Sequence, residues 1–383
     1  MPERAGRKLV VAVFIDALGW EIYQRHGFLQ KHLRHAQPLR TTFGYSSACD
    51  PTILTGVPPR EHGHFSFFVR ARNASPFRWL RMLRWLPSSL FDRGRVRHWL
   101  SQLLAPVLGF TGYFRLYAVP FGVLPYFDYT EQRDIYEPGG INGGQRTIFD
   151  RLRERGTRFH VSDWRRCERG NLDALEEEIE RGDISFAYLY LAGLDAVLHD
   201  QGTAGTDVAG KLAWYERELD RLIRLAGDRY ADVELLVFSD HGMTDVVALV
   251  DVISAVEAAD LRFGRDYVAM YDSTMARFWL LTPAAEALRP LLEALPGGRI
   301  LEAEELRRLE CDFADQRYGD LFYLMEPGHL ISPSFMGREP LAGMHGYDPD
   351  HHDSVAFFAA SCAPPRRPRG LADLHDLILE TVA

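Results

Sequence analysis

Three short, almost wholly apolar runs constrain the fold of this chain more than any other feature of its sequence. They cover residues 9–15, 185–191 and 234–238, and each is about as long as one β-strand. Strands that are apolar on both faces are typical of parallel sheets, because helices cover such sheets on each side. Segments with helical patterning alternate with the runs, at residues 147–155, 171–181 and 207–226. The order predicts an α/β fold with a mostly parallel central sheet and helices on both faces.

The length, net charge and cysteine content limit the number of domains and the kinds of binding partner that this chain can have. The 383 residues suffice for one large α/β domain with insertions, or for two to three domains. With a net charge of -9, the chain is a poor candidate for binding a nucleic-acid polymer, and we expect none as a partner. Four cysteines without CxxC spacing predict neither a disulfide scaffold nor a thiolate metal site. The oligomeric state does not follow from these features.

The first apolar run is relevant to the cellular location of the protein, because it could be mistaken for a signal peptide. The run ends in Asp16 rather than in a small-residue cleavage site, which argues against a signal peptide. A membrane-spanning helix needs about 20 predominantly apolar residues, and the apolar stretch 99–127 is interrupted by Pro106, Pro120 and Pro125. We therefore expect a cytoplasmic protein without a signal peptide or transmembrane helix.

Polar residues follow each of the three runs, where the strands of a parallel sheet end. Ligands of such sheets bind beyond the carboxyl ends of the strands. Carboxylates and imidazoles at these places, or in a later glycine-flanked turn, are Asp16, Asp195, His199, Asp240, His241 and His345. Asp195 and His199 share a helix face at i and i+4, and together with the others they are ligand types that suit zinc. Each residue alone is also compatible with a turn, a cap or a chance pair. His351 and His352, in an acidic setting, are more typical of a solvated loop.

A small-residue turn precedes a further apolar segment and carries two serines. Residues 44–48 read GYSSA, the apolar run 52–55 follows, and Gly56 with Pro58 and Pro59 ends it. The pattern predicts a helix with a serine at its N-terminal end. The free N–H groups and positive dipole there suit a phosphate or a serine alkoxide. Alternatively, Ser46 or Ser47 is only the N-cap, a position that serine favours.

The order of these motifs resembles the alkaline phosphatase superfamily. The resemblance rests on Asp16, the serine turn with its Thr55-Gly56 exit, Asp195-x-x-x-His199, Asp240-His241-Gly242 and Gly343-x-His345-Gly346. Within the superfamily, the chain is most similar to the type I phosphodiesterase/nucleotide pyrophosphatase branch. The similarity covers about residues 8–250 and 340–362. Cys49-Asp50-Pro51 superficially echoes the Cys-x-Pro-x-Arg motif of sulfatases, but Ile53 stands where that motif needs arginine.

The resemblance implies a metal-dependent hydrolase of phosphate esters. Asp195, His199 and His345 would hold one divalent ion, and Asp16, Asp240 and His241 the other, alongside the nucleophile Ser46, with Ser47 as the runner-up. Zinc is the expected metal and Mn²⁺ the alternative. Metal-activated Ser46 would form a phosphoseryl intermediate that water hydrolyses. We expect a phosphodiesterase or nucleotide pyrophosphatase. The alternatives are a phosphomonoesterase or phosphonate hydrolase, a phosphoryl-group transferase on a lipid-linked substrate, and a non-catalytic binding module.

Two insertions are expected to interrupt the alkaline phosphatase-like core, which comprises residues 8–64, 146–250 and 341–383. Residues 251–340 are predicted to form an α+β cap, with a helix around residues 284–294 and a strand near residues 321–325. Residues 65–145 are rich in arginine and aromatic residues, and residues 70–115 hold nine arginines against one acid, Asp92. Within this insertion, residues 77–86 are predicted to form a basic amphipathic helix, with an apolar stripe of Trp79, Met82, Leu83 and Leu86. The insertion is interpreted as a lid over the site. Peripheral membrane contact through residues 77–100 and a protein–protein surface are the alternatives.

Overall fold

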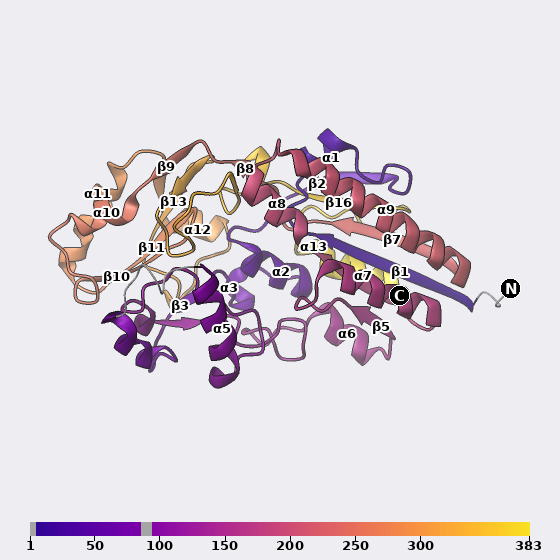
Figure 1. The fold of residues 1–383 in the computed structure, drawn as a ribbon, viewed down its shortest axis with the longest axis horizontal. Helices are drawn as coiled ribbons and strands as arrows, with labels where there is room; N and C mark the ends of the chain where they lie inside the picture. Colours follow the sequence, from indigo (N-terminus) through magenta and orange to yellow (C-terminus); the bar gives the residue numbers. More distant parts are fainter. Residues whose placement is uncertain (1–4, 86–93) are drawn as a thin grey trace.

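The computed structural model describes residues 5–85 and 94–383. The parts of the predictions that concern Leu86, Asp92 and Arg93 therefore lie outside the described residues. Figure 1 shows an elongated molecule, in which a sheet flanked by helices occupies one end and a smaller sheet the other.

The predicted mostly parallel central sheet is confirmed. Its strand order is β2 (His35–Leu39), β16 (Ala356–Ala360), β7 (Tyr230–Phe238), β1 (Ala5–Ile15), β6 (Phe186–Leu191) and β5 (Phe159–Val161). β1 pairs in parallel with both β6 and β7, and β5 pairs in parallel with β6. β16 alone runs antiparallel to its two neighbours in this sheet. The apolar runs found in the sequence are thus β1, β6 and β7 at its centre.

Helices cover both faces of this sheet, as the sequence predicted. Alternate residues of β1 point to opposite faces, so that Val11 and Val13 belong to one hydrophobic cluster and Ala12 and Phe14 to the other. The first cluster is completed by α1 (Trp20–His26), α7 (Glu168–Arg181), α8 (Gly193–Gln201) and α9 (Thr206–Arg229). The second is completed by α2 (Ser46–Thr55), α6 (Ile148–Glu154) and α13 (Asp373–Val382). The α/β fold class is therefore confirmed.

The end of α2 follows its turn chemistry. The helix ends at Thr55, and Gly56 takes the left-handed conformation, with φ of 73° and its N–H bonded to the Thr52 carbonyl. The prolines do not exclude a second short helix. α3 (Pro59–His62) begins with Pro59 at its first position, where proline costs no hydrogen bond.

A second, smaller sheet lies beyond the core in residues 251–340. It is antiparallel, with the strand order β10 (Tyr267–Tyr271), β11 (Met275–Leu280), β13 (Leu321–Met325) and β12 (Gly298–Leu301). We call it the cap sheet. The elements around it are α10 (Val252–Glu257), η3 (Pro283–Ala287), α11 (Leu288–Glu293) and α12 (Ala303–Arg308). The helix expected around 284–294 and the strand expected near 321–325 are found as η3 with α11 and as β13.

The arginine-rich insertion packs on the same hydrophobic cluster as the cap sheet. Its described elements are β3 (Phe68–Arg70), η1 (Arg78–Trp85), α5 (Gly94–Leu108), η2 (Leu124–Tyr126) and β4 (Phe127–Tyr129). β3 and β4 pair with each other, and the cluster runs from Phe68 and Tyr129 to Tyr267 and Phe278 of the cap sheet. The boundaries given above for the core and its insertions stay a prediction.

The predicted α-helix over residues 77–86 is wrong in type. Residues 78–85 form a 3₁₀-helix, which has three residues per turn. Phe77 and Leu80 are therefore buried and Leu83 is partly buried, whereas Trp79 and Met82 of the expected apolar stripe are 42% and 80% exposed. The exposed arginines Arg78 and Arg81 lie between them in the sequence.

No helix within residues 5–85 and 94–383 combines the length and apolarity that crossing a membrane requires.

Candidate active site

The first group of side chains lies where β1 and β7 end, at the carboxyl edge of the central sheet. Asp16 follows β1 directly, and Ala17 turns the chain sharply with a φ of 61°. Asp240 and His241 follow β7 two and three residues after its last residue. The Ala17 N–H donates to Asp240 Oδ1 at 3.3 Å, and the Tyr190 hydroxyl donates to Asp16 Oδ2 at 2.6 Å. These bonds hold two buried carboxylates side by side.

The second group comes from α8 and from the late strand β15 (Gly343–Met344). Asp195 and His199 lie one turn apart on α8, with Asp195 Oδ1 3.3 Å from His199 Nε2. β15 pairs antiparallel with β8 (Thr244–Asp245), just after the Asp240-His241 turn, and this pairing brings His345 to the site. His199 Nδ1 lies 2.8 Å from the Gly343 carbonyl, so the ring can donate there and keep Nε2 free as a ligand.

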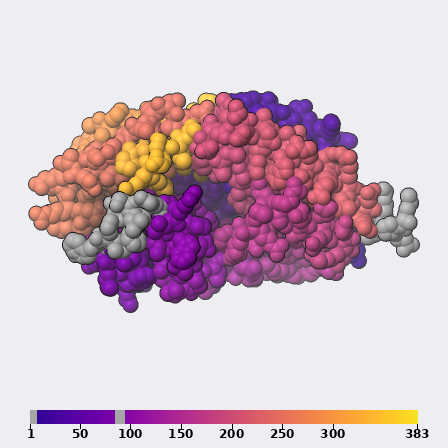
Figure 2. Space-filling model, in the orientation of Figure 1, coloured from indigo at the N-terminus to yellow at the C-terminus, as the bar shows by residue number. Residues whose placement is uncertain are grey.

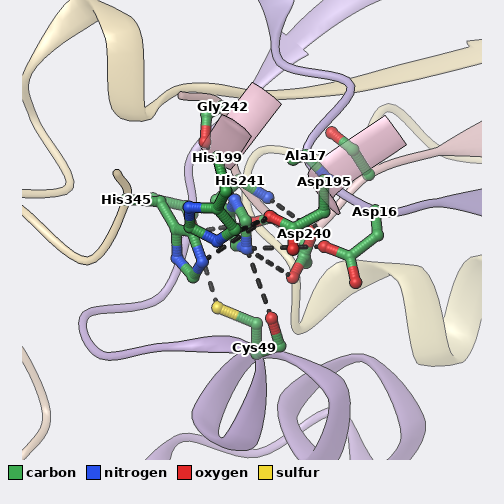
Figure 3. A network of polar contacts seen from close by, with 12 residues as sticks. Asp16, Ala17, Cys49, Asp195, His199, Asp240, His241, Gly242 and His345 are labelled. Carbon is green, nitrogen blue, oxygen red and sulfur yellow. Dashed lines mark hydrogen bonds and ion pairs between the residues drawn. The ribbon is translucent and has the colours of Figure 1, made fainter. Parts of the chain in front are cut away.

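All six predicted ligands meet at one place, which Figure 3 shows from close by. The ligand atoms of Asp16, Asp240 and His241 lie within 4.8 Å of one another, and so do those of Asp195, His241 and His345. His241 thus belongs to both trios, whereas His199 joins the second through Asp195. The family resemblance implies His241 as a ligand of the Asp16 group alone. The rings of His241 and His345 stack, with centroids 3.7 Å apart.

The electrostatics of this cluster favour added positive charge. Burial, and then the charges of Asp240 and Asp195, raise the pKa of Asp16 well above its ordinary value. Burial lowers the pKa of His345 well below the usual range, and the neighbouring His241 and His199 lower it further. Burial opposes protonation of His241 too, but the charges of Asp240, Asp16 and Asp195 prevail and raise its pKa to about 10. The carboxylates repel one another, and His241 offsets part of this repulsion, together with His199 beside Asp195.

Several ligand atoms in the cluster have no hydrogen-bond partner among the described residues. They are Asp16 Oδ1, Asp195 Oδ1, Asp240 Oδ2 and His345 Nδ1, and all are buried, although Asp195 Oδ1 and Asp240 Oδ2 lie 3.3 and 3.0 Å from a histidine Nε2. Buried polar atoms are normally satisfied, and a group left unpaired costs about 1–3 kcal/mol. Carboxylate oxygens and imidazole nitrogens are ligands that divalent zinc and manganese accept. The donor set and its unpaired atoms therefore fit divalent cations.

Ser46 and Ser47 differ in what their hydroxyls face. Ser46 is the first residue of α2, while Tyr45 is the N-cap, and Ser46 Oγ lies 3.3 Å from His241 Nε2. Ser47 is 2% exposed, and its hydroxyl donates to the Phe65 carbonyl at 3.1 Å. Neither serine side chain caps the helix. Of the two, only Ser46 directs its oxygen to the ligand cluster.

Three other residues considered in the sequence analysis are not among the side chains of this ligand cluster. Cys49 is 1% exposed, and its thiol lies against Thr41 and the Thr42 carbonyl, as expected for a small buried residue. Burial, helped by the charge of Asp240, raises the pKa of this thiol. His351 and His352 form a partly exposed group with Asp353 and do not line the cavity described next.

A cavity of about 560 Å³ opens beside Ser46 and the ligand cluster. Figure 2 shows the surface hollowed between the insertion, in purple, and the late segment near residue 340, in yellow. Sequence reasoning missed several residues that line it, notably Asp50, Glu131 and Tyr190. Asp50 could have been found, because it lies four residues after Ser46 on the same helix face. Glu131 lies in an irregular part of the insertion, where the sequence gives no periodic signal.

Comparisons with known proteins agree with this fold. A family model described as type I phosphodiesterase / nucleotide pyrophosphatase matches residues 10–348. Murine ectonucleotide pyrophosphatase / phosphodiesterase 5 superposes with a TM-score of 0.71 at 16% identity, covering 98% of this chain and 95% of that chain. Its inactive variant in complex with AMP gives 0.70 at 16% identity, with the same coverages. The human protein gives 0.69 at 15% identity, covering 98% and 94%.

The solved structures are too distant in sequence to show more than the fold. Among curated proteins, none matches this chain. The family model, however, spans most of the sequence, from β1 to beyond His345. The chain therefore belongs to the type I phosphodiesterase/nucleotide pyrophosphatase family, whose members are phosphoric ester hydrolases.

Proposed function

We propose that this protein hydrolyses phosphate diesters with two divalent metal ions and a phosphoseryl intermediate on Ser46. The observation that carries the proposal is the 3.3 Å contact between Ser46 Oγ and His241 Nε2, because His241 belongs to both trios of ligand atoms. A nucleophile in that place adjoins the side chain that the two trios share. The cavity beside it offers room for the esterified alcohol.

The metal ligands proposed are those expected from the sequence. Asp195, His199 and His345 would hold one ion, and Asp16, Asp240 and His241 the other, with Ser46 adjoining it. When bound, two divalent cations supply Lewis acidity for the attacking and leaving oxygens. The side-chain chemistry supports Zn²⁺, with Mn²⁺ as the alternative.

The chain's own residues account for binding and orientation. The amides of Ser46 and Ser47 begin α2, where helix N–H groups and the dipole favour a phosphate oxygen. Ser46 Oγ attacks phosphorus as the bond to the first alcohol breaks, and water later cleaves the phosphoseryl bond. Tyr190 fixes the orientation of Asp16 through its 2.6 Å hydrogen bond. Cys49 takes no part, because its thiol is buried against Thr41 and Thr42.

Activity on four chromogenic esters, with added Zn²⁺ or Mn²⁺, tests the reaction type. We expect faster hydrolysis of bis-p-nitrophenyl phosphate and thymidine 5′-p-nitrophenyl phosphate than of p-nitrophenyl phosphate or p-nitrophenyl sulfate. A preference for the monoester would favour the phosphomonoesterase alternative. No reaction with any of them would favour a transferase or a binding module.

Replacing Ser46 tests the nucleophile. Ser46→Ala should lower kcat on the diester by at least about 10³-fold, because the attacking oxygen is gone. The six ligand side chains remain, so Zn²⁺ should still raise the melting temperature of this variant as it does that of the wild type. Ser47→Ala is the matched control and should keep most activity. Equal loss in the two variants, or full activity of Ser46→Ala, would contradict the assignment.

Peripheral membrane contact is a second proposal, favoured by the outer face of the insertion. On α5, Trp99, Leu103 and Val107 lie four residues apart and are 68%, 50% and 76% exposed, and α5 contains no acidic residue. Met82 and the exposed arginines of η1 belong to the same insertion. An apolar stripe with nearby basic groups suits an anionic membrane surface. A lipid-linked substrate and a cytoplasmic location stay predictions.

Flotation with vesicles tests this contact. We expect the protein to float with vesicles of anionic phosphatidylserine at low salt, and less so with purely zwitterionic vesicles. Trp99→Ser combined with Leu103→Ser should abolish flotation. Val247→Ser with Leu249→Ser is the matched control, because these residues are equally exposed but lie outside the insertion, at 78% and 52%. No flotation of the wild type at low salt would remove the proposal.

A further inference from the structure

The N-terminal end of α8 is capped by side chains from two other helices. The first N–H groups of a helix have no partner within it, and Ala192, the N-cap residue of α8, makes no side-chain hydrogen bond to them. Instead, the Gly193 N–H donates to Glu168 Oε1 of α7 at 2.8 Å. The Leu194 N–H donates to the Tyr215 hydroxyl of α9 at 3.1 Å. Because Tyr215 itself donates to Glu168 Oε1, both N–H groups depend on one carboxylate.

A lysine fixes Glu168 in this place. The Lys211 ammonium group of α9 bonds to Glu168 Oε2 and also lies 4.7 and 4.9 Å from the ring centroids of Trp214 and Tyr215. The side chains of Glu168 and Lys211 are 18% and 21% exposed. A Cβ on Gly193 would lie 2.5 Å from Lys211 Nζ, so these side chains close directly over the start of α8. We call Glu168, Lys211 and Tyr215 the capping network.

The first turn of α8, which the capping network holds, carries a proposed metal ligand. Asp195 is the third residue of α8. Its Oδ1 lies 3.3 Å from His199 Nε2 and 3.7 Å from His345 Nε2, the other proposed ligands of the same ion. Asp16 and Asp240 follow β1 and β7 instead, so their positions do not depend on how α8 begins.

Loss of the cap should therefore affect the two proposed ion sites unequally. A helix whose first N–H groups lose their partners frays at that end. In α8, fraying would displace Asp195, whereas His199 lies one turn further along with its ring against the Gly343 carbonyl at 2.8 Å. One carboxylate ligand would be lost, and the imidazole beside it would stay.

Building on the proposed two-metal function, we propose that Glu168 is a positioning residue for the ion of the Asp195 group. Glu168 acts through the N–H groups of Gly193 and Leu194, and it thereby holds the Asp195 carboxylate beside the imidazoles of its group. Loss of a residue that orients a ligand typically lowers metal affinity by roughly 10- to 100-fold. The ion of the Asp16 group should not depend on Glu168.

Glu218 allows this role to be separated from a purely structural one. Like Glu168, it connects α7 with α9, because its carboxylate bonds to both terminal nitrogens of Arg169 at 2.8 and 2.6 Å. Its side chain is 14% exposed, which is close to the exposure of Glu168. Its bonds within the described part of the chain are to arginines and not to α8. Glu218→Ala is therefore the matched control for Glu168→Ala.

Zinc titration of the metal-free protein, in competition with a chromophoric chelator, measures both affinities without turnover. We expect the wild type to bind two Zn²⁺ ions, and Glu168→Ala to bind one of them at least about tenfold more weakly. The unchanged affinity for the other ion would show that this variant is folded. Glu218→Ala should bind both ions as the wild type does. Wild-type affinities in Glu168→Ala, or an equal loss at both ions, would overturn the proposal.

A conservative variant tests whether the acceptor oxygen is what matters. Glu168→Gln keeps one oxygen that can accept from the Gly193 N–H and from Tyr215. It is combined with Lys211→Met, so that no ammonium group competes for this oxygen. The double variant should bind the weakened ion at least about threefold more tightly than Glu168→Ala does. Equal weakness of the two variants would overturn the proposal.

Combination with ligand variants identifies the ion. In an Asp195→Ala background the ligand that Glu168 positions is absent, so adding Glu168→Ala should change zinc affinity by less than about twofold. In an Asp16→Ala background, the same addition should still weaken the remaining ion by about tenfold. The opposite pattern would overturn the proposal.

The titration also separates this inference from the proposed function. A wild type that binds two zinc ions and hydrolyses diesters, with a Glu168→Ala variant that binds both ions equally well, would refute the inference alone. A wild type that binds neither Zn²⁺ nor Mn²⁺ would refute the proposed function and the inference with it.

Discussion

Glu131 makes the stability of this protein depend on pH. Burial, helped by the charge of Asp134, raises its pKa from 4.5 to about 8. Between these values the unfolded chain ionises while the folded protein keeps the proton. The free energy of unfolding therefore falls as pH rises, by about 1.4 kcal/mol for each pH unit. Below pH 4.5 both states are protonated, and above pH 8 the loss is complete.

Glu131→Gln should remove this dependence. At pH 5 the variant and the wild type should have similar free energies of unfolding in urea. At pH 9 the variant should be more stable, by on the order of 5 kcal/mol, since glutamine carries no charge to bury. Glu339→Gln is the matched control, because Glu339 lines the same cavity but is exposed, and it should show no such gain at pH 9. A variant that is no more stable than the wild type at pH 9 would contradict the burial of an unpaired charge.

At the scale of single residues, the sequence predicts the site residues that directly follow a strand of the central sheet. Asp16 and Asp240 follow central strands, and neighbouring parallel strands end at one edge of a sheet, so their convergence follows from the apolar runs. Glu131 lies 85 residues after Ser46 in a segment without periodicity. Only long-range packing decides that it faces the same cavity.

At the scale of elements, the short pairing of β8 with β15 positions two of the proposed ligands. It brings His345 beside His241, while the Gly343 carbonyl accepts from His199. A Cβ on Gly343 would lie 2.6 Å from the Leu198 carbonyl of α8, which leaves no room for a side chain. The strand would have to move away from the helix.

Gly343→Ala should therefore impair activity more than folding. A shift of about 1 Å in a catalytic group can lower the rate by roughly 10²-fold, so we expect a loss of that order in kcat/KM. Circular dichroism should remain like that of the wild type. The matched control is Gly337→Ala, because a Cβ there meets nothing within 4 Å, and it should keep full activity. Equal activity in the two variants would show that β15 tolerates the displacement.

The spacing of apolar residues predicts the helices and strands of the packed core well. It predicts poorly where an α-helix and a 3₁₀-helix would give similar spacings. The helices α6, α7 and α9 and the strand β13 fall close to where the sequence places them. In η1, the apolar spacing of residues 79, 82, 83 and 86 suggested an α-helical stripe, whereas burial of residues 77 and 80 follows a period of three. Because the surrounding aromatic cluster selects the buried face, the sequence alone does not settle the period.

At the scale of the molecule, the insertion and the cap sheet are coupled. They share one hydrophobic cluster, and buried Arg277 of β11 bonds to Asp272 at 2.8 Å, to the Ser66 hydroxyl at 2.9 Å and to the Phe68 carbonyl at 3.2 Å. Each of these partners lies at the junction of the two segments. Opening the insertion would remove two of the partners of this buried guanidinium, the Ser66 hydroxyl and the Phe68 carbonyl.

Hydrogen exchange should therefore report one cooperative unit. Peptides that cover β3 with β4 and peptides that cover β10 with β11 should exchange with equal opening free energies, measured by mass spectrometry. Asp272→Asn should lower both together, by roughly 3 kcal/mol, because Arg277 loses its charged partner. Separate opening free energies in the two sets of peptides would show that the segments are independent.

The position of β16 bears on how the protein is made. This strand, residues 356–360, lies between β2 and β7 and is synthesised after both of them. Until it is synthesised, the edge of β7 stays open to pairing with other chains, and β2 has no neighbour. His345 also emerges only shortly before it. The nascent chain thus contains Ser46 long before the site can be completed, and it depends on protection from aggregation until β16 has been synthesised.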